Sequence, residues 1–199
     1  MDSKGDPEHG LDEALHGAES RASSEFERLY AGAVPALIAW ARLRMSSLPS
    51  GRIDVEDIVQ ETWVRALENF GRFRDRESFR HWVIGIAQNV LLEALRRDVR
   101  QRRDPLRNQA GSNLSQCPDT VTSISRAAAR DDGFLRLLGL ILELPTDDRQ
   151  LLLLHGLEER PLANVARQLE ISEEAAGKRW QRLRARLQEQ PAFLAVLTA

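Results

Sequence analysis

The stretch from Phe70 to Trp82, "FGRFRDRESFRHW", alternates arginines with large aromatic rings. Such rings can stack on unpaired bases while arginines follow the phosphates of the same strand. The rings can equally be core anchors at the start of a helix, with the arginines pointing into water. The residue types therefore predict either a site for single-stranded nucleic acid or a packed loop.

A second stretch, "PLANVARQLEISEEAAGKRWQRLRARL", lies near the C-terminus. Its apolar residues have the spacing that packs two short helices across a tight turn, as in a helix-turn-helix. The second helix would present basic side chains outward, which suits insertion into the major groove of DNA. A basic amphipathic helix is more often a solvated face, so this pattern alone leaves both interpretations open.

Other kinds of chemistry find little support in the sequence. Cys117 is the only cysteine, so neither a disulfide framework nor a paired-cysteine metal motif is expected. The apolar runs are too short to cross a bilayer and the N-terminus lacks an apolar signal core, which favours a cytoplasmic protein without membrane insertion. We predict no enzyme activity, cofactor or metal site, because the histidines are scattered along the chain (His9, His16, His81 and His155).

The charged residues are sorted into blocks although the net charge is only −2. Residues 1–27 and 54–69 are acidic, whereas residues 96–107 and 177–186 are rich in arginine. Blocks of opposite charge indicate that different parts of the chain bind different partners.

The apolar periodicity is helical throughout, and no run is typical of a strand. We therefore predict an all-α protein with two small helical domains joined by a flexible linker, the C-terminal one a helix-turn-helix. Residues 1–20 are expected to be a disordered acidic tail and residues 21–103 the N-terminal domain. A linker rich in Pro, Gly and Ser follows at 104–123, and the C-terminal domain spans 124–190.

Capping residues predict where several helices begin and end. Asp54 is expected to start a helix that ends at Gly71, and Ser78 to start the next one. Four further helical segments are expected in the C-terminal domain, at about 124–143, 146–156, 161–169 and 173–188, with Thr146 and Ser172 as caps.

In this order, five segments resemble bacterial RNA polymerase sigma factors of the extracytoplasmic-function (ECF) group, within the sigma-70-like family. They are "FERLY", "DVEDIVQETWVRAL", "FRDRESFRHWVIGIAQNVLLEALRR", "LPTDDRQLLLL" and "VARQLEISEEAAGKRWQRLRARL". The resemblance covers roughly residues 24–103 and 125–188. Its N-terminal part is the more specific, because a helix, a loop and a second helix match without a gap.

The resemblance implies core RNA polymerase and promoter DNA as partners, and a separate anti-sigma factor is a further candidate. The N-terminal domain would bind polymerase and open the minus-ten element. Acidic side chains repel phosphate, so the acidic helix suits a protein partner. Its implied polymerase contacts are Asp57, Gln60, Glu61 and Arg65.

The resemblance also implies two sets of DNA contacts. Phe70, Phe79 and Trp82 fit helix stripes and are expected mostly in the core, whereas packing explains Phe73 least. The implied minus-ten set is Phe73, Arg76, Arg80, Asn89, Arg96, Arg97 and Arg100. The C-terminal domain would read the minus-thirty-five element through Ser172, Lys178, Arg179, Gln181, Arg182 and Arg186.

Four residues depart from the family's pattern, Gly85 and Ala175 among them, and two other functions stay open. Glu170 stands in the helix-turn-helix turn, where a left-handed backbone is costly without glycine. Gly177 stands on the recognition helix at a commonly basic position. One alternative is a stand-alone helix-turn-helix regulator, and the other is a polymerase-binding adaptor with weakened DNA reading.

The linker length predicts how the domains move. A relaxed flexible chain of about 20 residues averages only about 22–27 Å, whereas two promoter boxes one and a half turns apart lie roughly 50 Å from each other. The linker must therefore be stretched on the polymerase, and its slack in the free protein permits a closed form in which the domains mask each other.

Overall fold

The computed structural model describes residues 7–46, 48, 53–74, 79–103 and 130–197, and every element within these ranges is a helix. The prediction of an all-α fold is confirmed. Ser78, Arg76, Cys117 and the predicted linker 104–123 lie outside the described residues.

The first helix, α1 (Pro7–Ser46), is 40 residues long and starts inside the segment predicted to be disordered. The structure therefore differs from the prediction over residues 7–20. A proline at the first helical position and acids in the following turns suit a helix N-terminus, which accounts for this early start. The C-terminal half of α1 contributes many residues to the core, with Tyr30, Leu37 and Trp40 at 0 % exposure.

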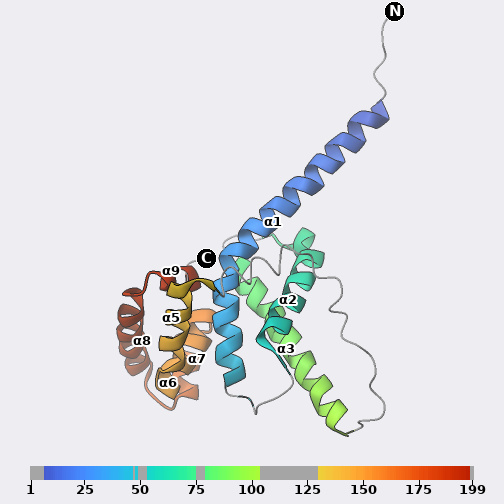
Figure 1. Ribbon diagram of the computed structural model, residues 1–199. Helices are drawn as coiled ribbons and strands as arrows, with labels where there is room; N and C mark the ends of the chain where they lie inside the picture. The colour runs from blue at the N-terminus through green and yellow to red at the C-terminus, as the bar shows by residue number, and fades with distance from the viewer. Residues whose placement is uncertain (1–6, 47, 49–52, 75–78, 104–129, 198–199) are drawn as a thin grey trace, which may run out of the picture.

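Helices α2 (Val55–Asn69) and α3 (Phe79–Arg103) pack against α1 and against each other (Figure 1). Asp54 caps α2 as predicted, since its side chain accepts a hydrogen bond from the Glu56 amide at 3.0 Å. Gly71 does not end this helix in the predicted way. A short 3-10 turn, η1 (Phe70–Arg72), follows α2, and no glycine in the described part of the chain has a positive φ.

Six helical elements lie within the described residues 131–197. They are α5 (Asp132–Leu142), α6 (Thr146–Leu151), the π-helical turn η3 (Leu152–Leu157), α7 (Leu162–Gln168), α8 (Glu173–Gln188) and α9 (Ala192–Leu197). Two of these helices begin directly after a residue whose side chain caps them. Asp131 caps α5 by accepting from the Phe134 amide at 2.7 Å, and Ser172 caps α8 as predicted by accepting from the Ala175 amide at 3.1 Å.

Three predictions in this half need correction. The helical segment predicted at about 124–143 is interrupted at Asp131, which caps α5, and residues 124–129 lie outside the described residues. Thr146 is the first residue of α6 rather than its cap, since Pro145 precedes the helix. Helix α9 extends the folded chain beyond 190, the expected end of this domain.

The turn between α7 and α8 has the backbone strain that the sequence indicates. Glu170 adopts a φ of 58°, in the left-handed region. A residue with a side chain adopts this conformation at a cost of roughly 1–3 kcal/mol. The tight turn is thus kept without the glycine that would relieve it.

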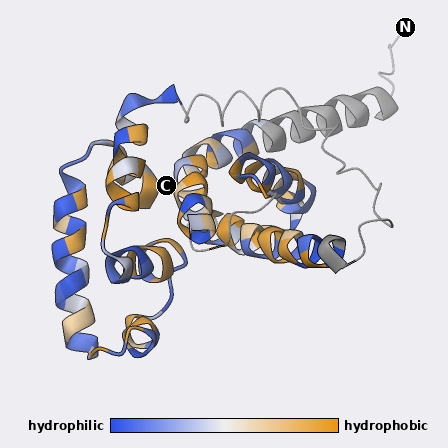
Figure 2. Ribbon diagram, turned by 60° about the horizontal axis from the view of Figure 1, so that its bottom comes forward, coloured by the Kyte–Doolittle hydropathy of each residue, from blue (hydrophilic) through white to orange (hydrophobic). Residues whose placement is uncertain are grey.

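The two halves of the molecule share one hydrophobic core. Figure 1 shows the C-terminal half of α1 lying between α2 and α3 on one side and α5 to α9 on the other. Figure 2 shows hydrophobic residues on the faces that these helices turn inward. Trp40 of α1 and Phe193 of α9 belong to the same buried cluster. The protein therefore has the closed arrangement that a slack linker permits.

The described helices do not meet the requirements of a membrane span. None of them is both long enough and apolar enough to cross a bilayer.

Candidate functional site

The outer face of α2 presents the acidic side chains predicted to bind polymerase. Asp57 is exposed in the first turn of the helix, and Gln60 and Glu61 are half-exposed further along. The opposite face of α2 is buried against α1 and α3 through Ile58, Val59 and Trp63. The amphipathic pattern thus fixes which acids point to solvent.

Arg65, the fourth member of that set, is only partly exposed and pairs with neighbouring carboxylates. Its Nη1 and Nη2 atoms donate to the two carboxylate oxygens of Glu93 on α3, at 2.9 and 2.7 Å, and its Nε atom donates to Glu61 at 2.8 Å. Hydrogen bonding to Glu93 and Glu61 raises the pKa of Arg65, and the bond from Arg65 lowers the pKa of Glu93. This two-pronged pairing joins α2 to α3.

The aromatic stretch packs more completely than the sequence indicates. The Phe73 ring lies 5.3 Å from the Phe79 ring, 5.1 Å from the Trp82 ring and 6.3 Å from the Phe70 ring, measured between centroids. Phe73 is half-buried against the core. Phe79 is buried as expected, and Phe70, Phe73 and Trp82 are each partly buried against the same core, so packing accounts for part of the Phe73 ring as well.

A cavity of about 410 Å³ lies beside these rings, between α2 and α3. Its lining combines an aromatic ring, two carboxamides and charged groups, and both carboxamides can donate and accept hydrogen bonds. Asn89, predicted in the minus-ten set, is one of these carboxamides. The lining residues are Arg65, Asn69, Arg72, Trp82, Ile86, Asn89 and Glu93.

Sequence reasoning missed Asn69 as a companion of Asn89, whereas Arg72 belongs to the stretch from Phe70 to Trp82 that it identified. Asn69 ends α2, where it donates to the Arg65 carbonyl at 2.8 Å, and Arg72 lies in the next turn. The pairing of Arg65 with Glu93 sets the register of α2 against α3 and so brings these residues opposite Asn89. An acid and an arginine 28 positions apart carry no local signal for this pairing.

The arginines of α3 divide between two places. Arg96, Arg97 and Arg100 are exposed near its C-terminal end. Arg80 lies at the other end, about 24 Å away at 1.5 Å per residue, and only 11 % of its side chain is exposed. Its guanidinium contacts the C-terminal half of the protein, so the structure does not bring the four arginines into one patch.

The recognition helix α8 shows the outward basic face that the pattern predicts. Its exposed members include Ser172, Lys178, Gln181, Arg182 and Arg186. The outer face therefore meets the charge requirement for contact with DNA phosphates and base edges.

Arg179 does not belong to that outer face. It donates to Asp147 at 2.9 Å and to Asp148, both on α6, and the bond to Asp148 raises its pKa. Gly177 is half-buried, and a side chain there would lie 3.6 Å from Leu162 of α7. Gly177 therefore lies on the face of α8 that packs on α7, and not on the outer face that would contact DNA.

Two family models match separate parts of the chain. The model of sigma-70 region 2 matches residues 29–101, and the model of sigma-70 region 4 matches residues 134–187. The chain belongs to the sigma-70 family. Region 2 thus corresponds to α1 from Leu29 onward with α2 and α3, and region 4 to α5 through α8.

Curated relatives agree with this membership. The chain is 32% identical over 111 residues to the ECF RNA polymerase sigma factor SigC of Mycobacterium tuberculosis, a match that covers 56% of each chain. It is 30% identical over 131 residues to the probable RNA polymerase sigma factor RfaY of Xanthomonas campestris, which covers 65% of this chain and 32% of that protein. The match therefore spans between a third and somewhat over half of these relatives.

Region 4 also contains a close contact that holds its recognition helix. A Cβ atom at Gly156 of η3 would lie 2.8 Å from Cη2 of Trp180 on α8. The Trp180 ring also lies edge-on to His155, with 5.1 Å between centroids. Only glycine at 156 lets the indole lie this close to the backbone of η3.

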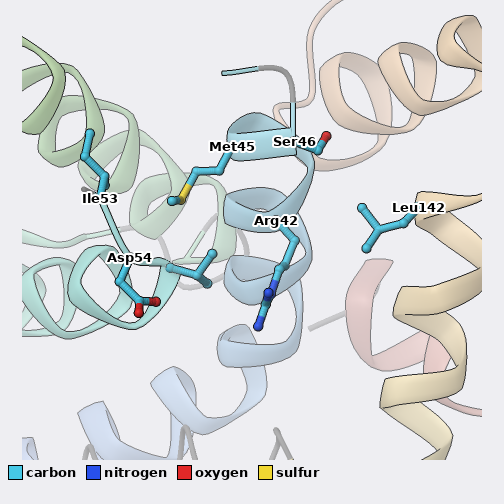
Figure 3. Close-up of a pocket in the computed structure, with 7 residues that line it drawn as sticks. Arg42, Met45, Ser46, Ile53, Asp54 and Leu142 are labelled. Atoms are coloured by element: carbon cyan, nitrogen blue, oxygen red, sulfur yellow. The ribbon is translucent and has the colours of Figure 1, made fainter. Parts of the chain in front are cut away.

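A further cavity, of about 480 Å³, lies where region 2 meets α5 of region 4 (Figure 3). It is bordered by the end of α1, the start of α2 and Leu142 of α5. Its lining residues are Arg42, Met45, Ser46, Ile53, Asp54, Val55 and Leu142. None of the predicted site residues borders it.

Proposed function

We propose that this protein is a sigma factor that binds core RNA polymerase and directs promoter-specific initiation of transcription. It would act in the cytoplasm as a DNA-binding specificity factor without catalytic chemistry of its own. The observation that carries the proposal is the presence of region 2 and region 4 in one chain and in that order. A stand-alone regulator has no need of region 2.

The polymerase contact is proposed on the exposed acidic face of α2. Asp57 carries the strongest case, because it is exposed, whereas Glu61 pairs with Arg65. Gln60 lies on the same helix beside them. Arg65 would act indirectly, by holding α2 against α3 so that this face keeps one orientation.

Recognition of the melted minus-ten strand is proposed at the cavity between α2 and α3. A base that leaves the duplex needs an aromatic surface and partners for its Watson–Crick edge. Trp82 supplies the ring, and Asn69 and Asn89 supply donors and acceptors. Phe73 would support Trp82 from behind, and the exposed Arg96, Arg97 and Arg100 would bind nearby phosphates.

Reading of the minus-thirty-five element is proposed on α8. The exposed side chains of Lys178, Gln181, Arg182 and Arg186 fit the usual placement of a recognition helix in the major groove. Ser172, at the start of α8, lies where a phosphate contact is common. Arg179 would position the helix through Asp147 and Asp148 rather than touch bases.

Gel filtration with purified core polymerase, followed by permanganate footprinting on promoter DNA, tests the proposal. A sigma factor co-elutes with core and makes thymines of the minus-ten element reactive. A stand-alone regulator would instead bind duplex DNA without polymerase. An adaptor without DNA reading would co-elute with core but leave every promoter unmelted.

A further inference from the structure

The last helix of the chain lies outside both matched regions. Helix α9 (Ala192–Leu197) follows the end of the region 4 match at 187. Its Phe193 and Val196 side chains are buried, at 1 % and 0 % exposure. Helix α9 packs on α1 of region 2 as well as on α5, η3 and α8 of region 4. It therefore lies between the two regions and contacts both (Figure 1).

Arg80 of region 2 fastens the end of α9. Its Nη1 atom donates to the carbonyls of Val196 and Leu197, at 3.2 and 2.5 Å. Its Nη2 atom donates to the Glu159 carboxylate at 2.6 Å. Arg80 thus donates hydrogen bonds to region 4 and to α9, although it belongs to the predicted minus-ten set.

A second fastening joins α1 to the segment after η3. The Glu158 side chain is 1 % exposed, and one of its oxygens accepts from Trp40 Nε1 at 2.9 Å and from Arg44 Nε at 2.8 Å. Arg160 lies 2.9 Å from the other oxygen. A buried carboxylate is stable only while such partners surround it, so separating the regions requires Glu158 to regain water.

The backbone at this point is also held in an uncommon conformation. Glu159, next to Glu158, has a φ of 54°. Left-handed conformations of residues with side chains persist where surrounding contacts enforce them, and often at switch points. Within region 4, the Arg160 amide donates to the Leu154 carbonyl at 2.9 Å across this turn, and Arg80 of region 2 contacts the Glu159 side chain.

We propose that α9, Glu158 and Glu159 form an intramolecular clamp that holds region 4 against region 2 and withholds Arg80 from DNA. The inhibitory role rests on the proposed function, because a sigma factor must separate its regions to span two promoter boxes roughly 50 Å apart. Release of the clamp frees Arg80 and lets the two regions move apart together. One event thus exposes a DNA contact and allows the correct spacing.

Small-angle X-ray scattering of the full chain tests the clamp without polymerase. The double substitution Phe193→Ser and Val196→Ser puts hydroxyls into the buried face of α9. We expect a larger radius of gyration than in the unmodified protein, at unchanged helix content by circular dichroism. Leu135→Ser is the matched control, since Leu135 is an exposed apolar residue of α5 and should leave the radius unchanged. An unchanged radius in the double variant, with its helices retained, would overturn the clamp.

A second set of variants, which exchanges two charges across the interface, tests the clamp if the α9 variant loses its helices. Arg80→Glu and Glu159→Arg each place like charges across the interface and should each enlarge the protein. The combined variant restores an ion pair and should bring the radius part of the way back. If the single variants stay as compact as the unmodified chain, or the combined variant is as open as either, the clamp does not exist.

Transcription with core polymerase tests whether the clamp inhibits the protein. If only about one molecule in ten is open, removing the clamp lowers the apparent dissociation constant about tenfold. The concentration of the Phe193/Val196 variant that gives half-maximal transcription with core polymerase should therefore fall by a similar factor. An opened variant with an unchanged half-maximal concentration would show that the clamp does not inhibit. If neither protein binds core, the proposed function fails, and the scattering results still decide whether the clamp exists.

Discussion

Arg65 and Arg179 are charged side chains on proposed binding helices that hold the fold together instead of facing a partner. Each arginine lies on a helix that is proposed to meet a partner, and each pairs with carboxylates of a neighbouring helix. A guanidinium presents five donors in a fixed fork, so two acceptors also fix the orientation of its helix. Their neighbours Asp57 and Arg182 remain exposed and are therefore the better candidates for direct contact.

Asp57→Lys is predicted to abolish binding to core polymerase while the helical fold persists. The side chain is exposed, so the reversal alters the surface potential of α2 without disturbing the core. Glu56→Lys is the matched control, because Glu56 is exposed in the same turn and has the same relation to the helix dipole but points about 100° away. Co-elution of the Asp57 variant with core at ordinary affinity would exclude this face as the contact.

Asn89→Ala is predicted to impair promoter melting and to leave formation of the closed complex unchanged. Contacts to a base edge exist only after the base has left the duplex, so they stabilise the open complex selectively. A loss of about 1–3 kcal/mol corresponds to a roughly five- to 150-fold smaller population of open complex. Permanganate reactivity of the minus-ten thymines, beside gel-shift measurement of total binding, separates the two steps.

Phe73→Ala serves as the comparison for Asn89. Because the Phe73 ring packs against Phe79 and Trp82, its removal should lower thermal stability first. Normal thymine reactivity in the Asn89 variant on fully paired DNA would remove Asn89 from the melting site. Recovery on a promoter already mismatched across the minus-ten element would instead support its role.

At the scale of elements, the recognition helix depends on three contacts with the rest of region 4. Arg179 pairs with Asp147 and Asp148 on α6, Trp180 lies against Gly156 of η3, and Leu183 and Leu187 reach the core. The outer face of α8 makes none of these contacts. Stability and DNA reading of α8 should therefore respond to different substitutions.

Arg179→Ala and Arg182→Ala are predicted to have opposite profiles. Loss of Arg179 leaves Asp147 and Asp148 unpaired and should destabilise region 4 by about 0.5–1 kcal/mol, since the pair is partly solvated. Loss of Arg182 should leave stability unchanged and weaken promoters that need the upstream box. Chemical denaturation and transcription from such promoters measure the two effects, and equal effects on both would contradict this division of roles.

Gly156→Ala is predicted to destabilise the protein by roughly 1–3 kcal/mol, as overpacking in a tight core does. The added methyl would meet the Trp180 ring at 2.8 Å, so α8 must shift away from η3. The reading face should shift with it, which would weaken upstream-box recognition. Trp180→Leu in the Gly156→Ala background should return part of the lost stability, and no recovery would mean that another contact carries the strain.

At the scale of the whole molecule, local signals were predictable from the sequence and long-range pairings were not. The caps Asp54 and Ser172 act within three residues, so the sequence around them suffices to place α2 and α8. The left-handed turn at Glu170 could be anticipated for the same reason. Arg80 instead meets carbonyls 116 and 117 positions away, and the pattern around it shows only a basic residue beside aromatic rings.

The closed packing also explains why helix α9 could not be predicted from the sequence. Six residues, all of them apolar, give too short a window to show helical periodicity. Phe193 and Val196 find their partners on α1, which the sequence assigns to a different domain. The boundary drawn at 190 therefore follows from treating the domains as separate, whereas in the closed chain they share a core.

Run-off transcription by purified core polymerase on a promoter library, with and without this protein, tests the central claim most directly. The account predicts that a subset of templates is transcribed only when the protein is present. These templates should share two sequence elements about one and a half helical turns apart, because regions 2 and 4 each read one. Transcription that never depends on the protein, or that shows no shared element among the templates, would contradict its assignment as a sigma factor.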